Sequence, residues 1–88
     1  MKIKEGFLLR QVAADHVVVP VGSKTVDFRC IITLNESGAF LWQLLQQETT
    51  VESVVQALLQ EYDVTEEMAV HHVEKFIGRL RENNLLDE

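Results

Sequence analysis

The first third of the chain carries the apolar pattern of short β-strands. Two β-rich runs, at residues 7–13 and 16–21, flank Ala13-Ala14-Asp15, which we predict to be a turn. Gly22-Ser23-Lys24 is the next turn signal, and a third strand is predicted at about residues 26–34. Connections this short favour an antiparallel meander.

From residue 35 onward the apolar positions follow helical spacing. The Asn35 side chain can cap a helix, and Glu36 places a negative charge in its first turn. Leu34 and Ala39 take the two positions of a hydrophobic staple. We therefore predict a first helix at about residues 36–47.

A second helix begins at the capping-box pattern Thr49-Thr50-Val51-Glu52. Its apolar residues recur at i, i+3, i+4, i+7, i+8 and i+11, which predicts one amphipathic stripe. The stripe consists of Val51, Val54, Val55, Leu58, Leu59 and Tyr62.

A third helix is introduced by Thr65, with two glutamates in its first turn. One face is apolar, and two further apolar residues lie on its flank. The face is Ala69, Val73, Phe76 and Leu80, and the flank is Val70 and Ile77. Asn83-Asn84 can adopt the left-handed conformation that ends helices, with Leu85 folding back onto the last turn. The final residues Asp87 and Glu88 are expected to fray.

Three strands followed by three helices predict an α+β domain close in shape to a winged helix. The helices would cover one face of a small antiparallel sheet. The 88 residues, 47% of them hydrophobic, suffice for a single domain over residues 1–88 with a modest core.

Charge narrows the class of partner. The chain has 8 Lys+Arg against 14 Asp+Glu, a net charge of −6, which argues against nucleic acid. No apolar run is long enough to span a membrane, and the first six residues are too few and too charged for a signal peptide. Cys30, the single cysteine, cannot form an internal disulfide, so a cytoplasmic location is expected.

Catalytic chemistry is not predicted. Cys30 falls in an apolar strand, and His71 and His72 project about 100° apart on a helix, which does not suit one metal ion. The chain lacks CxxC, HExxH, P-loop and GxGxxG patterns. We expect no enzyme, no cofactor and no metal site.

A basic row and a glycine on the third helix remain open to two interpretations each. His71, Lys75 and Arg79 form an i, i+4, i+8 row opposite the apolar face, which is either a solvated surface or a docking patch. Gly78 costs helix stability relative to alanine, and it either permits close approach by a partner or is neutral.

The third strand and third helix carry the better binding signal. An outer strand of a three-stranded sheet has a free edge, which can receive an added strand. On the helix, Val70 and Ile77 lie at one margin of the apolar arc, with Glu74 and Arg81 just beyond. In one interpretation these four residues form the wall of a groove. In the alternative interpretation, Val70 and Ile77 complete the core. A free edge beside a groove would suit an extended peptide.

A family resemblance appears in the stretch that joins the third strand to the first helix. Leu34-Asn35-Glu36-Ser37-Gly38 followed by Leu41-Trp42 and Leu44-Leu45 resembles the signature of the PqqD family, recognition elements of ribosomal peptide modification systems. Further support comes from residues along the rest of the chain. They are Val17-Val18-Val19-Pro20, Asp27-Phe28, residues 50–55, Phe76, Leu80 and Asn84-Leu85-Leu86.

The resemblance implies a winged-helix-like fold without catalytic activity. It implies that the leader segment of a precursor peptide binds as an extra strand beside the third strand and against the third helix. The bound peptide would then be delivered to a modifying enzyme, commonly a radical S-adenosylmethionine enzyme. Carried over by position, the peptide site is Phe28, Arg29, Cys30, Ile31, Ile32, Thr33, Val70, Glu74, Ile77 and Arg81. Trp42 is expected to be an internal anchor and not a ligand contact.

The sequence departs from the family pattern at two turns. Glycines often found in the family are missing from Ala13-Ala14-Asp15 and from Gln46-Gln47-Glu48.

Two alternative functions remain. A winged-helix DNA-binding regulator is one alternative, although the second helix offers Gln56 and Gln60 and no Lys or Arg. A structural subunit that forms a homodimer through its free edge is the other.

Overall fold

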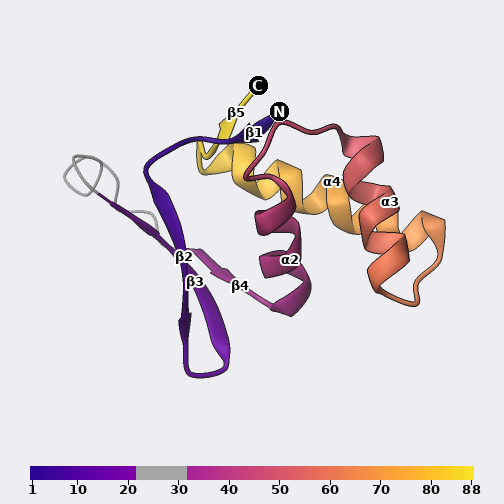
Figure 1. The fold of residues 1–88 in the computed structure, drawn as a ribbon, viewed down its shortest axis with the longest axis horizontal. Helices are drawn as coiled ribbons and strands as arrows, with labels where there is room; N and C mark the ends of the chain where they lie inside the picture. Colours follow the sequence, from indigo (N-terminus) through magenta and orange to yellow (C-terminus); the bar gives the residue numbers. More distant parts are fainter. Residues whose placement is uncertain (22–31) are drawn as a thin grey trace.

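The computed structural model describes residues 1–21 and 32–88, which form two small sheets and three helices (Figure 1). The strands are β1 (Lys2–Ile3), β2 (Phe7–Val12), β3 (Asp15–Pro20), β4 (Ile32–Leu34) and β5 (Leu86–Asp87). The helices are α2 (Glu36–Leu44), α3 (Val51–Glu61) and α4 (Glu66–Glu82). One sheet has the order β2-β3-β4 with antiparallel pairs, and β1 pairs with β5 in the other. The predicted α+β class, with an antiparallel meander followed by three helices, is confirmed.

The β2–β3 hairpin extends away from the helices (Figure 1). Val12 pairs with Asp15, so that the turn consists of Ala13 and Ala14 alone. Ala13 has a φ of 56°, the left-handed region in which a turn glycine is more usual. Asp15, which the sequence placed in the turn, is instead the first residue of β3.

The junction of β4 and α2 is capped as predicted. Asn35 Oδ1 accepts a hydrogen bond of 2.8 Å from the Gly38 N–H. A Cβ atom on Gly38 would lie 3.2 Å from both Leu34 Cβ and Asn35 Oδ1. The glycine therefore lets the first turn of α2 pack closely against the end of β4. Leu34 and Ala39, the two predicted staple residues, are both buried.

Two helix boundaries differ from the sequence expectation, both through contacts with the N-terminal segment. The cap of α3 is Thr50, whose Oγ1 accepts from the Ser53 N–H at 3.2 Å, and not Thr49. The Thr49 N–H donates instead to the Met1 carbonyl at 3.1 Å. Helix α2 ends at Leu44, short of residue 47, and the carbonyl of Leu45 accepts the N–H of Ile3. Neither contact is visible in local sequence.

The C-terminus of α4 has the predicted left-handed ending. Asn84 has a φ of 57°, its N–H donates to the Arg81 carbonyl at 3.0 Å, and the Leu85 N–H donates to the Leu80 carbonyl at 2.9 Å. This is the Schellman pattern, and it directs Leu85 into the core.

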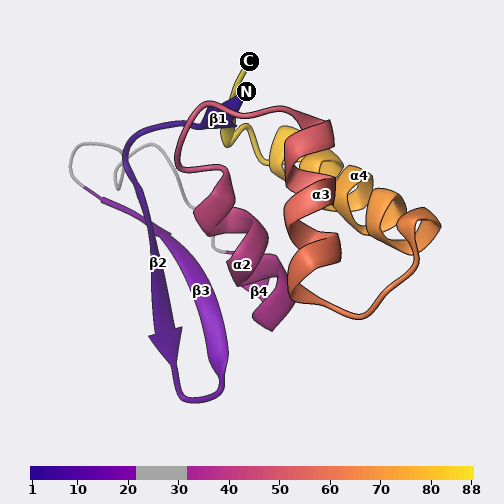
Figure 2. The same ribbon diagram turned by 45° about the vertical axis from the view of Figure 1, so that its right-hand side comes forward.

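The expectation that Asp87 and Glu88 fray was wrong. Asp87 pairs with Lys2 and Leu86 pairs with Ile3, so that the two ends of the chain lie side by side (Figure 2). Leu86 is buried, and this burial favours the pairing.

The core lies between the inner face of the three-stranded sheet and the helices. Its largest fully buried side chains are Leu34, Leu45, Leu80, Leu85, Val18, Val54 and Val73. Trp42 on α2 is 2% exposed, as expected for an internal anchor. Val51, by contrast, is 37% exposed, because it lies in the first turn of α3 at the margin of the predicted stripe.

Replacing Asn84 by alanine is expected to lower the free energy of unfolding by about 1 kcal/mol relative to an Asn84→Gly variant, because Cβ disfavours a positive φ. The comparison with glycine is matched, since both variants lose the hydrogen bond from Lys4 Nζ to Asn84 Oδ1. Urea unfolding followed by circular dichroism measures the difference. Equal stability of the two variants would mean that the left-handed ending is not populated.

Candidate functional site

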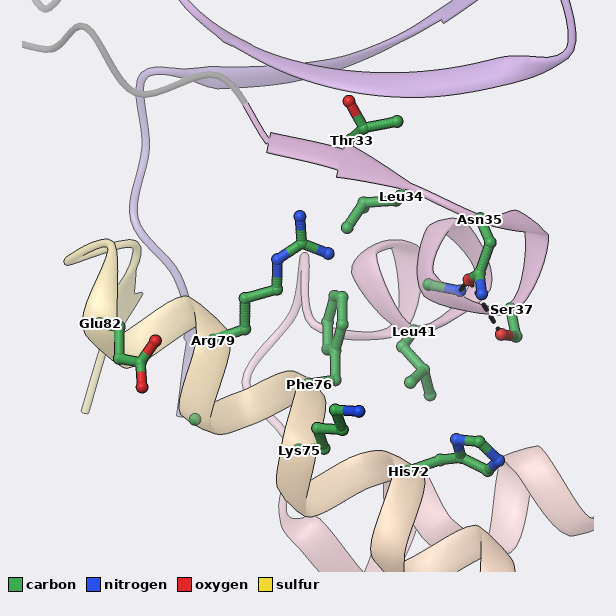
Figure 3. A pocket seen from close by; sticks show the side chains of 12 residues that line it. Thr33, Leu34, Asn35, Ser37, Leu41, His72, Lys75, Phe76, Arg79 and Glu82 are labelled. Atoms are coloured by element: carbon green, nitrogen blue, oxygen red, sulfur yellow. Dashed lines mark hydrogen bonds between the residues drawn. The ribbon is translucent and has the colours of Figure 1, made fainter.

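An open groove runs between β4 and α4 (Figure 3). Its volume is about 930 Å³. The lining residues are Thr33, Leu34, Asn35, Ser37, Gly38, Leu41, His72, Lys75, Phe76, Gly78, Arg79 and Glu82. Three elements therefore build it: the β4 strand, the first turns of α2, and one side of α4.

Strand β4 forms one wall and lies at the edge of its sheet. It pairs with β3 alone, with Ile32 opposite Val18 and Leu34 opposite His16. Its other side has no paired strand among the residues that the structure describes. Ile32 and Leu34 are buried, whereas Thr33 is exposed. A free row of backbone N–H and C=O groups at such an edge can receive another strand.

Helix α4 forms the opposite wall, which combines an apolar floor with basic side chains. Phe76 on α4 and Leu41 on α2 are buried and point into the space between these two helices (Figure 3). Lys75 and Arg79 are exposed, and the Arg79 side chain extends from α4 toward β4 (Figure 3). A Cβ atom on Gly78 would meet no atom of residues 1–21 or 32–88 within 4 Å. The helix therefore presents a notch at residue 78.

The two basic side chains of this wall are unpaired within the part of the chain that the structure describes. Within residues 1–21 and 32–88, neither the Lys75 ammonium nor the Arg79 guanidinium forms an ion pair or a hydrogen bond. Arg81, on a different side of α4, binds Glu88 through hydrogen bonds of 2.9 and 2.7 Å. Hydrogen bonds from Arg81 lower the pKa of the Glu88 carboxyl. The groove is thus lined by two cations that lack an ion-pair partner among the described residues, in a chain of net charge −6.

A smaller hollow of about 360 Å³ continues the groove past His72. It shares Asn35, Ser37, Leu41 and His72 with the groove, and it adds Glu36, Leu58, Tyr62 and Val64. The rings of Tyr62 and Phe40 meet edge to face, with centroids 5.7 Å apart. That contact positions Tyr62 in the wall of the hollow and gives this end of the groove an apolar, aromatic character.

The predicted strand residues fall partly on this groove. Thr33 lines it, and Ile32 is buried in the same strand. Residues 28–31, which are Phe28, Arg29, Cys30 and Ile31, lie outside the described residues, and their part in a site stays a prediction.

The four predicted helix residues do not line the groove. Ile77 is 2% exposed and belongs to the core, as the alternative interpretation held for it. Val70 packs against the core, and with Glu74 it lines a separate shallow hollow. Arg81 is engaged with Glu88. The structure therefore brings a different side of α4 to β4, and the binding role of these four residues stays a prediction.

The basic residues of the groove had a signal in the sequence. Lys75 and Arg79 stood out as an i, i+4 pair, and Lys75 has no acidic residue three or four positions away to neutralise it. Gly78 stood out as a glycine inside a helix. Of the row predicted with them, His71 lies at the separate hollow and does not line the groove. The neighbouring His72 lines both the groove and that hollow.

The described residues contain no group of three His, Cys, Asp or Glu side chains that could hold a metal ion. In the same part of the chain, no helix is both long enough and apolar enough to cross a membrane.

Known proteins resemble this chain in sequence and in fold. The family described as coenzyme PQQ synthesis protein D (PqqD) matches residues 15–86. The structure "TbiB1 in complex with the TbiA(beta) leader peptide" has a TM-score of 0.77 at 22% identity, over 99% of this chain and 95% of that one. The structure "lasso peptide synthetase B1 complexed with the leader peptide" has a TM-score of 0.72 at 21% identity, over 96% and 93%. No protein of curated description matches the sequence significantly.

Proposed function

Because the chain belongs to the PqqD family, we propose that it binds the leader segment of a ribosomally made precursor peptide and presents that peptide to a modifying enzyme. The groove between β4 and α4 is the observation that carries the proposal. It joins a strand edge, which has no partner strand among residues 1–21 and 32–88, to a hollow large enough for side chains.

The mode of binding we propose is strand addition. An extended peptide laid along β4 continues the sheet β2-β3-β4, and its main chain forms hydrogen bonds with the free edge. Side chains on one face of the added strand then enter the groove above Phe76 and Leu41. The main-chain bonds give affinity for any extended peptide, and the groove gives selectivity. The two structural neighbours support this proposal, since both are described as complexes with a leader peptide.

The role we propose is delivery and not catalysis. A bound leader holds the rest of the precursor near the enzyme that modifies it, and this raises the effective concentration of the substrate. The enzyme we propose as partner is a radical S-adenosylmethionine enzyme, and the site of action is the cytoplasm, where the precursor is made.

Charge and helix composition count against the DNA-binding alternative. Helix α3, the recognition helix of a winged-helix regulator, contains no Lys or Arg, and it carries Glu52 and Glu61. The chain as a whole is acidic. Phosphate contacts would have to come from basic residues that this helix does not have.

Amide chemical-shift mapping tests the proposed site. Peptides are selected from a random display library against the immobilised full chain and titrated into ¹⁵N-labelled protein. We expect the largest shifts at Thr33, Leu34 and along residues 72–82 of α4, because these amides border the groove. Shifts confined to the β2–β3 hairpin or to α3 would contradict the proposal.

A further inference from the structure

We propose that the groove selects acidic leader segments, by seating a carboxylate side chain of the peptide over Gly78 between Lys75 and Arg79. The inference rests on the proposed function and adds to it the chemical class of the ligand. Three independent observations support it: the free charges of the wall, the notch at residue 78 and the spacing of the two cations.

The free charges require a partner once a peptide covers them. Lys75 and Arg79 have no ionic or hydrogen-bonded partner among the described residues, and both line the groove. In the free chain, water solvates both groups. A strand added beside β4 displaces that water, and a cation left unpaired beneath it disfavours binding. A peptide that supplies a carboxylate avoids this penalty and gains charge-assisted hydrogen bonds.

The notch provides the space for that carboxylate. Residues 75, 78, 79 and 82 share one stripe of α4, so that residue 78 lies beside both cations. Glycine inside a helix is unfavourable relative to alanine, yet a Cβ here would meet no atom of the described residues within 4 Å. Packing of the fold therefore does not require glycine at this position. The space beside residue 78 is therefore open to a side chain of a bound peptide.

The spacing of the cations matches that of side chains on an added strand. Lys75 and Arg79 are one helical turn apart, about 5.4 to 6 Å along the axis. Side chains on one face of a strand recur about every 6.6 to 6.8 Å. Two acidic residues at positions i and i+2 of the peptide can therefore each meet one cation. Glu82, one turn further along the stripe, disfavours an acid at its own end of the groove.

The test uses a display library of random twelve-residue peptides, selected against three versions of the full chain. They are the wild type, a Lys75→Gln/Arg79→Gln double variant, and a Lys2→Gln/Arg10→Gln control that loses the same charge outside the groove. We expect Asp or Glu at a fixed position to be enriched in peptides from the wild type and the control. The double variant should lose that enrichment. All four residues lie at least partly exposed, so the variants should fold, which circular dichroism checks.

Affinities complete the test as a double-mutant cycle. For the strongest wild-type peptide, changing the selected acid to its amide should weaken binding to the wild type by about 10-fold, close to the lower end of the range measured for close charge pairs. The same change should alter binding to the double variant by less than about 2-fold.

The outcomes separate this inference from the proposed function. Peptides that map to the groove without an acidic preference would overturn the inference and leave the proposed function standing. Acid enrichment that persists in the double variant would also overturn it, because the selectivity would then reside elsewhere. If no selected peptide maps to the groove, both proposals fail.

Discussion

Replacing Gly78 by tryptophan is expected to weaken peptide binding by at least about 30-fold, the loss of about 2 kcal/mol that accompanies removal of a binding hot spot. The indole would project from α4 into the groove and occupy the space in which side chains of the added strand should lie. The fold should tolerate the change, since a Cβ at residue 78 meets no atom within 4 Å in the part of the chain that the structure describes. Fluorescence anisotropy of a labelled, display-selected peptide measures the effect.

The matched control for this experiment is Glu74→Trp. Glu74 is also exposed on α4, but it borders the separate hollow and not the groove. If the peptide lies against β4, the Glu74 variant should bind within about 2-fold of the wild type, as expected for a substitution outside an interface. The opposite result, strong loss at residue 74 and none at residue 78, would favour the helix residues proposed from the sequence. If both variants bind the peptide as tightly as the wild type, α4 is not part of the site.

Replacing Trp42 by alanine is expected to lower the free energy of unfolding by about 3–5 kcal/mol, the usual range for truncating a buried aromatic side chain. Trp42 is 2% exposed and lies on α2, the helix that contacts both the sheet and α4. A domain of this size has a total stability of about 5–15 kcal/mol. The variant should therefore unfold at much lower urea concentration than the wild type.

Circular dichroism is the suitable probe for that experiment, because the substitution removes the only tryptophan. The control is Gln43→Ala, an exposed change on the adjacent position of the same helix, expected to alter stability by no more than about 0.5 kcal/mol. A loss below about 1 kcal/mol for Trp42→Ala would be incompatible with a close-packed anchor at this position.

Features set by local chemistry were predictable from the sequence. The Asn35 and Thr65 caps, the apolar face of α4 and the left-handed residue Asn84 each follow from neighbours within a few positions. The β1–β5 pair was missed because each strand has two residues, and such a pair exists only through contact between distant parts of the chain. The shift of the α3 cap to Thr50 has the same origin.

The sequence predicted which strand and which helix, β4 and α4, would border the candidate site. It did not predict which side of α4 would face β4. A wide apolar arc on α4 has two margins, and hydrophobic periodicity does not say which one faces β4. The sequence interpretation took the margin with Val70 and Ile77. The structure places Ile77 in the core and the other margin, with Lys75 and Arg79, beside the strand. That choice depends on how α2 and α4 pack together, which is a tertiary property.

The outer edge of β4, which has no strand partner among the described residues, also bears on how the free protein behaves in concentrated solution. Such an edge invites pairing with the same edge of another molecule. Each molecule carries a net charge of −6, and like charge resists that approach. The acidity of the chain should therefore oppose edge-to-edge pairing, and salt, which screens this repulsion, is expected to shift the balance toward self-association.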